Sequence, residues 1–180
     1  GADVYVADLV GLAMSREMAA LMTSVIMAGR SGAAFAAHLG TMKVSEEIDA
    51  LSTFGFHPVD MLALPRLLAL IIMMPLLTLY ANFVGYFGGA LIGYSMLNIS
   101  LTQYLFETQT IVTTVDISIG LVKSTVFGFI VAASGCVQGL NCGKDAAAVG
   151  HAATRAVVTS ITIIVVADAI FAVICEILKI

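Results

Sequence analysis

Apolar stretches of membrane-spanning length alternate along the chain with short segments that carry most of the charged residues. No Asp, Glu, Lys or Arg occurs in residues 67–106, 124–143 or 156–167. A helix that crosses the roughly 30 Å hydrocarbon layer needs about 20 mostly apolar residues. Forty helical residues would extend about 60 Å, so the longest run predicts one span followed by a polar, uncharged turn. We expect four spans, at about 9–40, 67–97, 117–137 and 156–175.

The composition supports the same fold class. Hydrophobic residues make up 60% of the 180 residues, charged residues only 11%, and the mean hydropathy is +1.04. A soluble domain of this size buries only about 70% of its chain surface, so it could not hide this much apolar surface. We therefore predict an all-α polytopic membrane helical bundle that forms a single transmembrane domain over residues 1–180.

Basic residues in the short connections predict the orientation. Lys43 and Arg66 flank one connection, Lys144 and Arg155 flank another, and the connection at 98–116 has neither Lys nor Arg. Connections rich in Lys and Arg stay in the cytoplasm. This topology would leave both ends of the chain outside, so we expect a further span before residue 1.

The first cytoplasmic connection contains a predicted amphipathic helix at about 45–55. Ser45 is the expected N-cap, acidic residues occupy the first turn, where the helix dipole favours anions, and apolar residues recur at helical spacing. An interfacial helix on anionic lipid would favour Lys and Arg instead, so we favour a protein partner over the lipid surface. Its candidate contact residues are Ser45, Glu46, Glu47, Asp49, Leu51 and Phe54.

Five charged residues lie within the predicted spans, where ionisable groups usually face a cavity or the bundle interior. Arg16 and Glu17 either form an interfacial pair or line a polar cavity. We expect Arg30 to pair within the bundle. Lys123 and Asp168 predict an interhelical salt bridge, with a proton relay as the alternative.

Small residues recur every four positions, which lets membrane helices approach closely. We interpret these ridges as packing within one bundle, with dimerisation through one ridge as the alternative. The glycines selected as packing positions are Gly32, Gly85, Gly89, Gly93 and Gly128.

The sequence predicts no catalytic, metal or nucleic-acid site. Each of the three histidines lacks a second ligand at helical spacing, and eight Lys and Arg against twelve Asp and Glu leave no basic face for nucleic acid. The segment 139–145 is too short for a phosphate-binding loop and does not follow a strand. We therefore expect no enzymatic activity and no cofactor in this chain.

Three segments resemble the MlaE/YrbE permeases of MCE-type ABC lipid transporters. The first is MAGRSGAAFAAHLGTMKVSEEIDALSTFGFHPVDMLALPR, and the others are PLLTLYANFVGYFGG and ATRAVVTS with the later Asp168. The resemblance implies a homodimeric permease of the bacterial inner membrane that moves phospholipid or a related lipid between the inner and outer membranes. It also implies five spans in the full family chain, of which four lie here. Glu47 departs from the family, which often has Gln there.

The resemblance further implies specific partners and residue roles. ATP and Mg would be bound by two cytoplasmic ATPase subunits, a periplasmic MCE-domain protein would form a ring, and a STAS-domain protein would join some systems. The helix at 45–55 would be the coupling helix that docks into the ATPase, and Arg16 and Glu17 would lie near the lipid cavity. Two alternatives remain: an ion- or proton-coupled transporter or channel that uses the intramembrane charges, and a membrane scaffold without transport.

Overall fold

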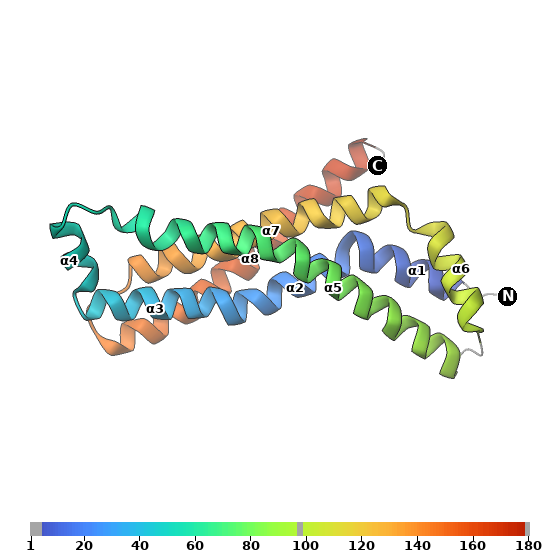
Figure 1. Ribbon diagram of the computed structural model, residues 1–180, viewed down its shortest axis with the longest axis horizontal. Helices are drawn as coiled ribbons and strands as arrows, with labels where there is room; N and C mark the ends of the chain where they lie inside the picture. Colours follow the sequence, from blue (N-terminus) through green and yellow to red (C-terminus); the bar gives the residue numbers. More distant parts are fainter. Residues whose placement is uncertain (1–4, 97–98, 179–180) are drawn as a thin grey trace.

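The computed structural model describes residues 5–96 and 99–178, and within these ranges it contains helices and no strand (Figure 1). Four helical segments are long and apolar enough to cross a membrane, which confirms the predicted all-α polytopic bundle. All four begin before the expected limits, and the first, third and fourth also end beyond them, because the helices continue past the hydrocarbon layer. The expected end of the second span, residue 97, lies outside the described residues. The segments are Tyr5–Val44, Val59–Met96, Thr114–Leu140 and Ala146–Leu178.

The first segment is one long helix in which two π-helical turns separate three α-helical stretches. It consists of α1 (Tyr5–Ala13), η2 (Met14–Met18), α2 (Ala19–Met27), η3 (Ala28–Gly32) and α3 (Ala33–Val44). A π turn accommodates one extra residue in the helix, and such turns frequently occur at functional sites. The turn η2 contains Arg16 and Glu17, and η3 contains Arg30.

The helix α7 (Thr114–Leu140) is the centre of the bundle. It packs against α3, against α5 (Leu64–Met96, which follows the π turn η4, Val59–Ala63) and against α8 (Ala146–Leu178). Glycines allow these close contacts: a Cβ on Gly128 would lie 2.9 Å from the Leu70 carbonyl oxygen, and one on Gly135 would lie 2.7 Å from that of Gly32. Gly32 and Gly128 therefore lie at helix contacts within this chain.

The connection expected as a turn contains a further helix, α6 (Leu101–Ile111), so the expectation of an irregular connection there is corrected. The Ser100 hydroxyl caps this helix by accepting a hydrogen bond from the Gln103 amide, with 3.2 Å between the heavy atoms. Tyr104 packs α6 against α5. Its side chain is buried, and its hydroxyl and ring lie against Gly89 and Gly93 of α5.

The predicted cytoplasmic helix is present as α4 (Glu47–Thr53), but its start differs from the expectation. Ser45 does not cap it, because its hydroxyl donates back to the Thr41 carbonyl oxygen at 3.1 Å and also bonds to the Glu47 carboxylate. Glu46 instead makes the corner in the left-handed conformation, with φ of 61°. Gly55, with φ of 84°, follows the end of the helix in the left-handed conformation that glycine adopts without strain.

The arrangement places the two basic connections together. Figure 1 shows α4 and the turn between α7 and α8 at one end of the elongated bundle, whereas α6 and the first described residues lie at the other. This grouping agrees with the predicted topology, in which the two connections that carry Lys and Arg share the cytoplasmic side.

Candidate functional site

A cluster of charged side chains joins three of the four spans. The Lys123 ammonium on α7 lies 2.5 Å from the Glu17 carboxylate on η2 and 3.2 Å from the Asp168 carboxylate on α8. The Lys123 side chain is fully buried, while those of Glu17 and Asp168 are 40% and 20% exposed. The expected salt bridge between Lys123 and Asp168 is present, and Glu17 is an additional partner.

Arg16 points to a different partner from its neighbour, as expected for adjacent residues on a helix. Its guanidinium lies 3.4 Å from the carboxylate of Asp116, which is nearly buried. The same carboxylate accepts hydrogen bonds from the backbone amide and hydroxyl of Thr113, and this reciprocal capping box starts α7. The sequence analysis missed Asp116, although a Thr followed three residues later by Asp ahead of an apolar run is a known helix-start signal.

The cluster holds helices together, and Glu17 is its more accessible carboxylate. In their ionised forms, Lys123, Glu17 and Asp168 together have one net negative charge, and Arg16 and Asp116 balance each other. The exposed part of Glu17 and Arg16 offers charged groups to a polar ligand, while the buried ammonium fixes the spacing of η2, α7 and α8. Within residues 5–96 and 99–178, no three His, Cys, Asp or Glu side chains are placed to hold a metal ion.

Arg30 lies apart from this cluster, and its placement differs from the expected pairing within the bundle. Its side chain is exposed and faces a groove between α2 and α5 with a volume of about 470 Å³. Among the described residues it has no ion-pair or hydrogen-bond partner.

The helix α4 presents its acidic side chains to solvent. Glu46, Glu47 and Asp49 are all exposed, and Ile48 is the residue that turns inward. Phe54, which the periodicity assigns to the apolar face, is 77% exposed. An acidic surface with an exposed aromatic ring is therefore available at this end of the bundle.

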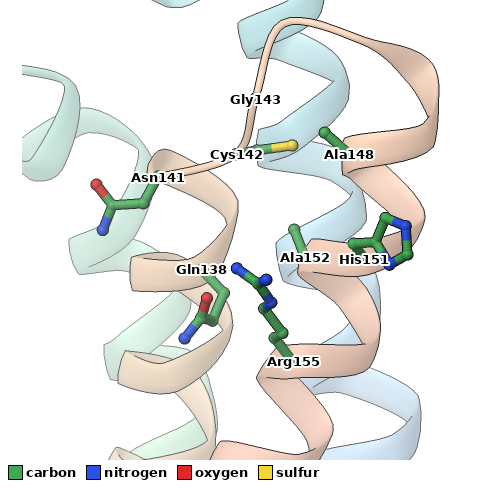
Figure 2. Close-up of a pocket in the computed structure, with 8 residues that line it drawn as sticks. All are labelled: Gln138, Asn141, Cys142, Gly143, Ala148, His151, Ala152 and Arg155. Carbon is green, nitrogen blue, oxygen red and sulfur yellow. The ribbon is translucent and has the colours of Figure 1, made fainter.

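A polar pocket of about 270 Å³ lies at the same end, in the turn between α7 and α8 (Figure 2). Figure 2 shows the Arg155 guanidinium pointing into the space between the two helices near Gln138, with His151 on the outer side of α8. Lys43 secures the turn, because its ammonium donates to the Leu140 carbonyl oxygen at 2.6 Å. The end that carries the acidic α4 thus also carries a polar pocket lined by one arginine.

Comparison with known proteins places these features in a family. The permease MlaE family matches residues 1–174. A probable ABC transporter permease protein of Rickettsia typhi is 42% identical over 167 residues, which cover 93% of this chain and 64% of that protein. A probable ABC transporter permease protein of Synechocystis is 40% identical over 168 residues, with the same coverage of both chains.

A plant protein is similar as well. The chloroplastic protein TRIGALACTOSYLDIACYLGLYCEROL 1 of Arabidopsis thaliana is 38% identical over 168 residues, which cover 93% of this chain and 48% of that protein. The chain thus spans about 64% of the length of the bacterial relatives it matches. With four apolar helices long enough to span a membrane and a match over residues 1–174, this multi-pass membrane chain belongs to the MlaE permease family.

Proposed function

We propose that this chain forms the membrane path of an ABC transporter that moves phospholipid or a related lipid between the inner and outer membranes of a bacterium. The observation that carries the proposal is that one chain has both an exposed acidic helix, α4, at one end of the bundle and the charged cluster around Lys123 in its other half. Relatives named ABC transporter permeases support it, as does a relative whose name contains that of a galactolipid, trigalactosyldiacylglycerol.

The partners follow from the same proposal. The chain would act as a homodimer with two cytoplasmic ATPase subunits, a periplasmic MCE-domain protein and, in some systems, a STAS-domain protein. ATP and Mg would be bound by the ATPase, so the permease itself would be no enzyme and hold no cofactor. In this arrangement, α4 transmits the closure of the ATPase, and the corner at Glu46 and the Lys43 contact with α7 carry the movement into the spans.

The coupling role of α4 is tested by reversing its charge. In the double variant Glu47→Lys with Asp49→Lys, we expect the ATPase to dissociate while the permease still inserts, because both side chains are exposed and lie outside the spans. Truncation of a buried, hydrogen-bonded charge pair at an interface costs about 2–5 kcal/mol, and repulsion adds to this loss. The measurement is co-purification of the ATPase with the full-length permease.

The matched control is Glu107→Lys, a charge reversal on α6 at the opposite end of the bundle, which should leave ATPase recovery unchanged. If α4 rests on anionic lipid instead, added lysines would strengthen membrane attachment by about 1 kcal/mol each. Undiminished recovery of the ATPase with the double variant would contradict the coupling role.

Reconstitution tests the transport activity. The full-length permease with its ATPase should move a fluorescent phospholipid in proteoliposomes when ATP is hydrolysed and not with a non-hydrolysable analogue. An ion-coupled transporter that uses Lys123, Glu17 and Asp168 would instead require a proton or ion gradient. Lipid movement that follows the gradient and ignores ATP would favour that alternative.

A further inference from the structure

Arg30 lies near the middle of the membrane on the first long helix. Thirteen positions separate it from Glu17 in one direction and from Lys43 in the other. At 1.5 Å per residue, each of these charged residues is about 20 Å away along the helix. Arg30 lies ten residues from the nearer end of the predicted span 9–40, or about 15 Å, beyond the reach of its own side chain.

An arginine at this depth is costly unless it meets a polar partner, so such residues mark cavities and pathways. Arg30 is exposed, and none of the described residues pairs with it. It faces the groove between α2 and α5, whose walls are mainly apolar and include Met27, Leu77 and Val84. The hydroxyl-bearing residues Thr23 and Tyr80 line the same groove. The groove therefore combines one cation and two hydroxyl donors with apolar walls.

The sequence limits where a negative partner could come from. No Asp or Glu occurs in residues 18–45, 61–106, 117–144 or 146–167, which include the part of each of the four described spans at the depth of Arg30. Asp168 lies nearer the other end and already contacts Lys123. A second copy of the described chain therefore has no free carboxylate to offer at this depth. A membrane phospholipid has a phosphate together with acyl chains that suit the apolar walls.

We propose that the Arg30 groove is a binding site for the phosphate group of a membrane phospholipid, with Thr23 and Tyr80 as additional donors. Arg binds phosphate through paired, charge-assisted hydrogen bonds. The flexible side chains of Met14 and Met27 adapt the walls to acyl chains of different shape. This inference rests on the proposed lipid transport. It adds a lipid-binding site within the membrane that is separate from the charged cluster around Lys123.

Photo-cross-linking in the full-length permease tests the site. The photoreactive residue p-benzoyl-phenylalanine replaces Ile26, an exposed residue that lines the groove, or Phe129, an exposed residue of α7 that does not line it. Membranes contain ³²P-labelled phosphatidylglycerol. We expect strong labelling from position 26, and a loss of about tenfold with Arg30→Gln, the size expected when a charge-assisted hydrogen bond is removed.

Three controls define the result. Arg30→Lys should retain part of the labelling, because the charge remains while the paired geometry is lost. Arg66→Gln should retain all of it, since Arg66 contacts His38 away from the groove. Labelling from position 129 should be equal with and without Arg30→Gln, which shows that the variant is folded.

Two outcomes would overturn the site: labelling from position 26 that does not depend on Arg30, or a cross-link from position 26 to protein, from a second copy or from another part of the chain. The cross-link is measured without ATP, so it is independent of transport. Arg30-dependent labelling without ATP-driven lipid movement would contradict only the proposed function. Lipid movement without Arg30-dependent labelling would contradict only the site.

Discussion

Lys123 is the residue on which the charged cluster depends. Its ammonium is fully buried and contacts two carboxylates on different helices, whereas each carboxylate remains partly exposed. A buried charge is tolerated only when paired, and removing one partner of a buried pair typically costs about 3–5 kcal/mol. The three side chains are therefore unequal in their expected effect on stability.

Lys123→Met should lower the thermal stability of the purified permease strongly, toward the low end of that 3–5 kcal/mol range, because the 40% exposed Glu17 regains solvent. Asp168→Asn should cost only about 1 kcal/mol, since Lys123 keeps Glu17 as its partner. Thermal unfolding in detergent measures both. Equal losses for the two variants would show that the two carboxylates do not share the Lys123 ammonium.

At the scale of elements, the small residues of α5 hold the neighbouring helices in place. Gly85, Gly89 and Gly93 face Met14, Val10 and Tyr104 of this same chain, which favours packing within the bundle over dimerisation through this ridge. Gly88, by contrast, has open space where a Cβ would project. Adjacent glycines of one helix therefore differ in what they touch.

Gly89→Leu should displace the Tyr104 ring and loosen α6, at a cost of about 1–3 kcal/mol for the overpacked contact. Gly88→Leu is the matched control and should be nearly neutral. Hydrogen exchange of the amides in 101–111 measures the effect, which should be faster exchange in the first variant alone. Identical exchange in both variants would place Tyr104 elsewhere.

The hydrophobic pattern predicted the spans but not every helix. The bilayer fixes the length of a span, so charge-free runs such as 67–106 reveal it directly. The same absence of charge concealed α6, whose apolar residues continue the preceding run. The exposure of Arg30 could not be read from the sequence either, because it depends on the rotation of the helix about its axis and on the π turns. Asp116 was predictable from its capping pattern.

For the whole molecule, the placement of α4 and α6 at opposite ends predicts their accessibility across the membrane. In a background without Cys136, Cys142 and Cys175, Ser52→Cys should be labelled only from the cytosolic side and Gln103→Cys only from the other, because Lys and Arg gather at the end with α4. Both positions are exposed, so a membrane-impermeant maleimide reports them directly. Labelling of both from one side would contradict the four-span arrangement.

The two π turns in the first long helix affect how this helix can change in evolution. Each turn adds one residue, and a helix rotates by about 100° per residue, so the stretches on either side of η2 or η3 are held out of the phase of a regular α-helix. A single-residue deletion within η3 would restore a regular helix and leave its length almost unchanged. The same deletion outside the π turns, in α2 or α3, would instead rotate the Arg16–Glu17 segment by about 100° and turn it away from Asp116 and Lys123. Hydropathy would hardly register such a deletion, so among relatives the spacing between Glu17 and Lys43 is more informative than the identity of the apolar residues between them.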